Sequence, residues 1–147
     1  PEKSVYGNWP RSGEIDIVET INEKSDELVT TIHYGHDYHR QISKTTFLNQ
    51  LTKLSNPIDH NKISLIWEEK YFEWLLNDQL VFKVNFNEVE NLEPNPFLEE
   101  FYLLINVAVG GNWPGTPNST MYCNSRKSCP DVKKLIVDYI AYYEKIN

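Results

Sequence analysis

The alternation of apolar and polar residues along most of the chain predicts strands rather than helices. No long segment keeps the 3.6-residue period of an amphipathic helix. Short alternating segments, several of them rich in β-branched and aromatic residues, are instead expected to be strands at residues 13–21, 28–34, 62–68, 71–76, 80–86, 101–109 and 135–143. Short strands separated by turn signals favour an all-β antiparallel sandwich.

Two local patterns refine this expectation. The pair Asn77-Asp78 favours a turn, so residues 71–86 should form a hairpin. In its second strand, alternate residues are apolar and are expected on one buried face: Leu80, Phe82, Val84 and Phe86. Residues 93–100 are expected to hold one helical turn, because proline is tolerated at a helix start. The aromatic residues Trp67 and Trp74 are assigned to the core.

The strand at residues 13–21 carries three carboxylates. In an extended chain Glu14 and Asp16 share one face, and strict alternation would place Glu19 on the opposite, apolar face. An unpaired carboxylate buried there would cost several kcal/mol. A β-bulge near Val18 is therefore expected to return Glu19 to the face of the other two. Neighbouring carboxylates repel one another, so at least one pKa in the row should be raised.

A row of this kind suits glycoside hydrolysis with retention of configuration. One carboxylate acts as the nucleophile and a protonated partner assists the leaving group, with roughly 5 to 5.5 Å between them. Spacing along a strand does not deliver this separation, so the side chains of Glu14 and Glu19 are expected to lean inward over Asp16. A solvated acidic edge or a cation site accounts for the same spacing equally well, so spacing alone leaves these interpretations open.

Composition and charge narrow the class of ligand. The chain has 14 Lys and Arg against 21 Asp and Glu, a formal net charge of -7, which disfavours nucleic acid because phosphates need cationic neutralisation. No apolar run approaches the ~18 residues that indicate a membrane span, so no membrane partner is expected. The 4 Trp, 9 Tyr and 6 Phe fill sheet cores and also stack on flat ligands such as sugar rings.

Residues 9–19 (WPRSGEIDIVE) resemble the signature of glycoside hydrolase family 16, in the form with the bulge residue that the laminarinase-type endo-1,3-β-glucanases carry. Four further segments resemble that family in the same order: residues 31–35 (TIHYG), 63–67 (ISLIW), 105–115 (INVAVGGNWPG) and 137–143 (VDYIAYY). The resemblance covers nearly the whole chain. It implies a concanavalin-like jelly-roll β-sandwich acting on a β-glucan polysaccharide or oligosaccharide.

The place of the signature in the chain has its own implication. In the family it lies near the middle of the domain, whereas here it begins at Trp9. The resemblance thus implies an incomplete sandwich over residues 1–147, from the catalytic strand 13–21 to the closing strand 135–143, without the N-terminal strands. The missing half, or a swapped second chain, would then be needed to complete the fold, and activity of this piece alone would be in question.

The resemblance also assigns catalytic roles. It implies Glu14 as nucleophile, Glu19 as acid/base, and Asp16 as the group that controls the protonation and orientation of the nucleophile. No cofactor is implied for catalysis. The alternative is a non-catalytic, lectin-like β-glucan recognition protein on the same scaffold, but such relatives typically lack one or both of these glutamates.

Further residues are implied to bind substrate or metal. Trp9 would stack on a sugar ring and His33 would form hydrogen bonds in the cleft, with Asn106 and Trp113 as additional substrate contacts. The family also implies a structural calcium with Asp138 as one ligand. The three-residue spacing of His33, His36 and His39 does not match a closed zinc site.

Two signals bear on the compartment. Cys123 and Cys129 lie in a segment rich in Pro, Ser and Asn, where a disulfide would close a small loop. Asn118-Ser119-Thr120 fits the N-glycosylation sequon. Together they favour a secreted protein or one in a secretory or lysosomal compartment, although reduced cysteines and a chance sequon are the alternative.

Overall fold

The computed structural model describes residues 5–21, 24–48, 60–116 and 135–145. The chain divides into two compact units, Pro1–Leu103 and Leu104–Asn147, each described by itself. Cys123, Cys129 and the sequon at Asn118 lie outside the described residues. In the part of the chain that is described, no helix has the length and apolar character to cross a membrane.

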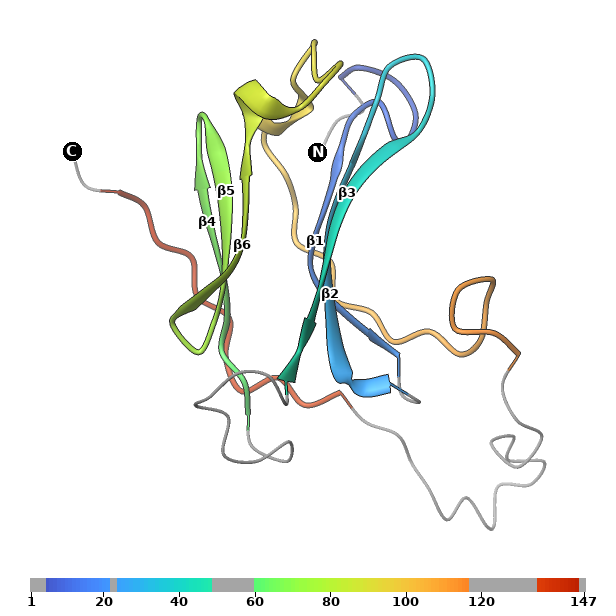
Figure 1. Ribbon diagram of the computed structural model, residues 1–147, viewed down its shortest axis with the longest axis vertical. Helices are drawn as coiled ribbons and strands as arrows, with labels where there is room; N and C mark the ends of the chain where they lie inside the picture. Colours follow the sequence, from blue (N-terminus) through green and yellow to red (C-terminus); the bar gives the residue numbers. More distant parts are fainter. Residues whose placement is uncertain (1–4, 22–23, 49–59, 117–134, 146–147) are drawn as a thin grey trace. The chain divides into compact units, whose positions relative to one another are not determined.

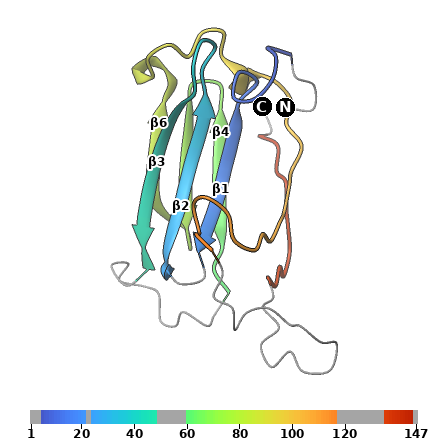
Figure 2. The same ribbon diagram turned by 90° about the vertical axis from the view of Figure 1, so that its right-hand side faces the viewer.

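The first unit contains two antiparallel sheets. One has the order β1-β2-β3, made of β1 (Glu14–Ile21), β2 (Lys24–Tyr34) and β3 (Arg40–Phe47). The other has the order β4-β5-β6, made of β4 (Ile63–Glu68), β5 (Tyr71–Leu76) and β6 (Gln79–Asn85). The sheets face each other as two layers (Figure 1), and Figure 2 shows β1, β2 and β3 side by side with β1 at one edge. The predicted all-β antiparallel sandwich is confirmed.

The core lies between the layers and is rich in aromatic rings. Ile32 and Tyr34 of β2 pack with buried residues of the second sheet and the segment after it: Phe72, Trp74, Val84, Phe86, Leu92 and Phe97. The Phe72 ring meets Trp74, Phe86 and Phe97 edge to face, with centroids 5.5, 4.9 and 5.2 Å apart. Edge-to-face pairs add stabilisation beyond the burial of their apolar area.

Phe97 is carried into this core by a helical turn. Two 3₁₀ turns, η2 (Phe86–Glu88) and η3 (Pro96–Leu98), follow β6, and η3 is the single turn expected within residues 93–100. The side chain of Asn95 caps η3 by accepting a 2.9 Å hydrogen bond from the Phe97 amide. Trp74 is fully buried, as predicted. Trp67, however, is 39% exposed because it lies on the edge strand β4; its indole N–H donates to the Phe97 carbonyl at 3.0 Å.

Strand prediction succeeded where alternation was clear and failed for β3. The strand 71–76 has the expected bounds, whereas β2 begins at Lys24, four residues earlier than the apolar pattern indicated. The sequence of β3, RQISKTTF, is mostly polar and was not expected to be a strand. It forms one because every residue from Arg40 to Phe47 pairs with β2, as the outer strand of the sheet.

The predicted hairpin is present, but the expected face of β6 is partly wrong. Asn77 and Asp78 both have positive φ (49° and 67°), the conformation of a tight two-residue hairpin turn. The register shifts between Trp74, which pairs with Phe82, and Leu75, which pairs with Leu80. This bulge turns Val81 toward the core and leaves Leu80 51% exposed.

The segments 101–109 and 135–143, both expected to be strands, form no strand in the structure. Alternation indicates a face that could be buried, but a strand also needs a neighbour for its backbone hydrogen bonds. The described residues of the second unit contain only one bridge, between Gly111 and Gly115, with N–H···O distances of 3.2 and 2.9 Å. Their apolar side chains are largely exposed, as Leu104 and Val109 show at 75%.

Thr46 offers a test of the packing between the layers. Its hydroxyl is buried and has no hydrogen-bond partner among the described residues, whereas that of Thr30 donates to the Lys44 carbonyl at 3.4 Å. Removing an unpaired buried hydroxyl relieves a desolvation cost, so Thr46→Val should raise the free energy of unfolding by about 1 kcal/mol. Urea denaturation measures the change. Thr30→Val is the matched control and should not stabilise; equal losses for both variants would contradict the expectation.

Candidate active site

The bulge expected near Val18 is confirmed by the pairing of β1 with β2. Glu14 pairs with His33, Asp16 with Thr31, and Glu19 with Val29. Between the last two pairs β1 has two residues where β2 has only Thr30, so one residue of β1 is extra. The insertion restores the alternation, and Glu14, Asp16 and Glu19 share one face of β1.

This arrangement raises the pKa values of Asp16 and Glu19. Burial, followed by the charges of Glu14 and Glu19, raises the pKa of Asp16 from 3.8 to about 7. Burial and then the charge of Glu14 also raise the pKa of Glu19. The predicted raising of at least one pKa is therefore confirmed. With a pKa of about 7, Asp16 can both donate and accept a proton near neutral pH.

The loop before β1 places Trp9 against Glu14. The indole N–H of Trp9 donates to Glu14 Oε2 at 2.5 Å, while 57% of the residue remains exposed. Ser12 stabilises this loop. Its buried hydroxyl donates to the Gly7 carbonyl at 2.7 Å and accepts from the Tyr6 amide at 3.2 Å. The hydroxyl of Tyr6 in turn donates to Glu99 at 2.9 Å. Trp9 is thus held in place while its ring stays accessible.

Gly13 joins this loop to β1 and cannot readily be replaced. Its φ of 78° lies in the left-handed region, and an added Cβ would come within 3.0 Å of Pro96 and 3.1 Å of Phe97. The start of β1 therefore packs directly on η3. The glycine of the signature is explained by this close approach.

His33 lies beside Asp16 and brings a second histidine to the site. His33 Nε2 is 3.1 Å from Asp16 Oδ2, and its Nδ1 is 2.8 Å from Nε2 of His39. The Trp9 ring contacts both imidazoles, with centroids 5.7 Å from His33 and 4.7 Å from His39. Burial lowers the pKa of His33; the charge of Glu14 opposes this effect and His39 adds to it.

His39 and Ser12 were not among the residues expected at the site. Gly35 makes the turn that returns His39 to His33: its φ is 117°, and a Cβ there would lie 2.2 Å from the Tyr38 carbonyl oxygen. In the sequence, the available signal for a contact between His33 and His39 was Gly35 followed by polar residues. It could not be used without knowing that the strand reverses at this point.

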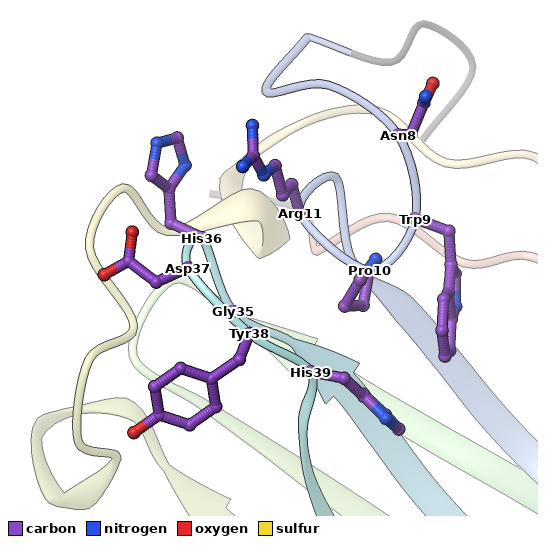
Figure 3. Close-up of a pocket in the computed structure, with 9 residues that line it drawn as sticks. All are labelled: Asn8, Trp9, Pro10, Arg11, Gly35, His36, Asp37, Tyr38 and His39. Atoms are coloured by element: carbon purple, nitrogen blue, oxygen red, sulfur yellow. The ribbon is translucent and has the colours of Figure 1, made fainter.

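A pocket of about 480 Å³ adjoins the carboxylate row and is formed by two loops, residues 8–11 and 35–39. Figure 3 shows Trp9 and His39 reaching from these loops on the same side of the pocket. Glu14, Asp16 and Glu19 do not line it, so the pocket is separate from the carboxylate row. The structure therefore gathers Trp9, Glu14, Asp16, Glu19 and His33 at one place.

The remaining expected site residues belong to the second unit. Asn106, Trp113 and Asp138 are exposed there, and their substrate and metal roles stay predictions. Within the described ranges, no three His, Cys, Asp or Glu side chains are grouped so as to hold a metal ion. The structural calcium with Asp138 as a ligand therefore stays a prediction.

Comparisons with known proteins find relatives named as endo-1,3-beta-glucosidases. No family model matches the chain. It is 32% identical over 163 aligned residues to glucan endo-1,3-beta-glucosidase A1 of Niallia circulans, covering 99% of this chain and 21% of that protein. It is 33% identical to glucan endo-1,3-beta-glucosidase of Cryptopygus antarcticus, covering 78% of this chain and 44% of that protein.

A solved structure agrees with these relatives. The laminarinase catalytic domain of Thermotoga maritima MSB8 matches with a TM-score of 0.65 and 30% identity, over 78% of this chain and 46% of that one. This chain therefore spans less than half the length of the proteins it matches. In its fold, its bulged acidic strand and its sequence, the chain is similar to the laminarinase-type endo-1,3-β-glucanases of glycoside hydrolase family 16.

Proposed function

We propose that the protein hydrolyses β-1,3-glucan with retention of configuration, with Glu14 as the nucleophile and Glu19 as the acid/base. The observation that carries the proposal is the bulge in β1, which puts both glutamates on one face with Asp16 between them. The relatives named as endo-1,3-beta-glucosidases support the substrate class. The exposed Trp9 ring next to Glu14 supplies an apolar face for a pyranose ring.

In the first step, Glu19 donates its proton to the glycosidic oxygen while a carboxylate oxygen of Glu14 attacks the anomeric carbon. The bond to the leaving sugar breaks, and a glycosyl ester forms on Glu14. The raised pKa of Glu19 suits this role, because the group must still hold a proton at the working pH. Trp9 holds the Glu14 carboxylate in place through its indole N–H.

In the second step, the ionised Glu19 removes a proton from water as the water oxygen attacks the anomeric carbon. The ester bond to Glu14 breaks, and two inversions give net retention. Asp16 keeps its own proton up to a pH of about 7, so the row does not carry three adjacent negative charges. His33, at 3.1 Å from Asp16, holds that carboxyl group in place.

The role of the two glutamates is tested by replacing each in the full-length protein. Glu14→Gln should lower kcat for laminarin by roughly 10³-fold or more, because no nucleophile remains. Glu19→Ala should hydrolyse laminarin equally poorly but regain turnover of an aryl β-laminarioside when azide is added, giving the β-glycosyl azide. Azide is an anion with no proton to lose, so it attacks the glycosyl ester on Glu14 without general-base assistance, and the retained β-configuration of the product indicates loss of the acid/base rather than of the nucleophile.

Undiminished hydrolysis by Glu14→Gln would disprove the assignment of the nucleophile. Binding of laminarin by the wild-type protein without any release of reducing ends would indicate a glucan recognition protein instead. Glu73→Gln is a suitable control, since Glu73 lies on β5 and pairs with Lys83 at 2.7 Å. This variant should retain wild-type kcat.

The raised pKa of Asp16 predicts a pH dependence of stability. The folded protein binds this proton more tightly than the unfolded chain, so ionisation of Asp16 reduces stability as the pH rises from about 4 to about 7. The Asp16→Asn side chain cannot ionise. Over this pH range the free energy of unfolding of the variant should therefore fall by ~1 to 2 kcal/mol less than that of the wild type, after allowance for solvent screening. Urea denaturation at several pH values measures the difference. The exposed loop variant Asp37→Asn should follow the wild type; identical profiles for all three proteins would contradict the expectation.

A further inference from the structure

His33 has a polar neighbour close to each ring nitrogen. Asp16 Oδ2 lies 3.1 Å from Nε2, and His39 Nε2 lies 2.8 Å from Nδ1. A neutral imidazole carries one N–H, so it donates at one nitrogen and accepts at the other. The contact of His39 at Nδ1 therefore decides whether His33 donates or accepts a proton at Nε2, toward Asp16.

While His33 is neutral, two arrangements place one proton in each of these two contacts. If His39 Nε2 accepts from His33 Nδ1–H, then His33 Nε2 must accept, and the proton of that bond belongs to Asp16. If His39 Nε2–H donates to His33 Nδ1, then His33 Nε2–H donates to an Asp16 carboxylate. Transfer of one proton along Asp16, His33 and His39 converts the first arrangement into the second, leaving His39 as the imidazolium if its own Nδ1 keeps its proton.

We propose that His39 is a positioning residue that acts through His33 to decide whether Asp16 holds its proton. This inference rests on the proposed function, because Asp16 lies between the two glutamates of the reaction. His39 is exposed, whereas the side chains of His33 and Asp16 are only 16% and 14% exposed. The three groups thus connect an enclosed carboxyl group to solvent.

The surrounding charges are compatible with this control. On β1, Glu14 and Glu19 disfavour ionisation of Asp16, and on β2 and β3 the neighbours are the hydroxyls of Thr31 and Ser43, 3.0 Å apart. Around His39, the Arg40 guanidinium lies 4.2 Å over the ring of Tyr38. The other titratable groups in the adjoining pocket are Arg11, His36 and Asp37.

The position of His39 does not depend on the hydrogen bond alone. The Gly35 turn directs the chain back, and the imidazole packs on Trp9 with centroids 4.7 Å apart. Hydrogen bonding and ring packing can therefore be removed separately. His39→Phe keeps an aromatic ring against Trp9 but offers His33 no partner, whereas His39→Gln offers an amide oxygen that can accept from Nδ1–H.

The first experiment compares the pH dependence of kcat/KM for laminarin in the full-length wild type and both variants. In His39→Phe, an N–H at Nδ1 would be unpaired, so His33 should donate from Nε2 and favour ionised Asp16. Because ionised Asp16 would give the row a third negative charge, the alkaline limb of the kcat/KM profile should then move to lower pH by about half to one unit. His39→Gln should stay within about 0.2 units of the wild type. An unmoved limb in His39→Phe, or equal shifts in both variants, would overturn the proposal.

A second readout needs no activity. Nitrogen-15 spectra of the histidine rings report which nitrogen of His33 carries the proton. At pH 7 the Nδ1–H form should be more populated in the wild type and in His39→Gln than in His39→Phe. Equal populations in all three proteins would overturn the proposal. A protein that fails to cleave laminarin but shows the expected spectra would refute the proposed function and leave the role of His39 standing.

Discussion

The pairing of β1 with β2 is the interaction on which the candidate site depends. Its register places Glu14 opposite His33, and its bulge brings Glu19 back to the face of Asp16. Without the extra residue, Glu19 would point between the sheets, where Val18 now lies with Leu28, Trp74 and Leu76. The cost of burying a charge there and the requirement for two glutamates on one face lead to the same backbone irregularity.

The start of β1 and the loop before it are held in place by contacts with η3 and the core. Gly13 packs on η3, which is itself capped by Asn95 and inserted into the aromatic core through Phe97. Ser12 and the contact between Tyr6 and Glu99 fix the preceding loop. Trp9 is therefore supported by the core although its ring is exposed, which combines precise placement with access for a ligand.

The enclosed face of β1 also explains why a row of acids is tolerated. Mutual repulsion and burial together shift Asp16 and Glu19 toward their protonated forms, so the row need not carry its full negative charge. The two histidines then provide an ordered set of partners for the central carboxyl group. The same interactions that reduce stability at neutral pH supply groups able to exchange protons, a combination frequent at active sites.

Sequence alone determined the features that depend on local backbone geometry. Alternation predicted most strands of the sandwich, the Asn77-Asp78 turn predicted the hairpin, and the mismatch at Glu19 predicted the bulge, because each follows from a few adjacent residues. Tertiary structure decided the rest. The polar strand β3 exists because β2 offers it a complete ladder, and the second bulge exposes Leu80 through a register that β5 imposes. His39 reaches His33 only because the chain reverses at Gly35, so a hydrogen bond between residues on opposite sides of a turn was not readable from their spacing.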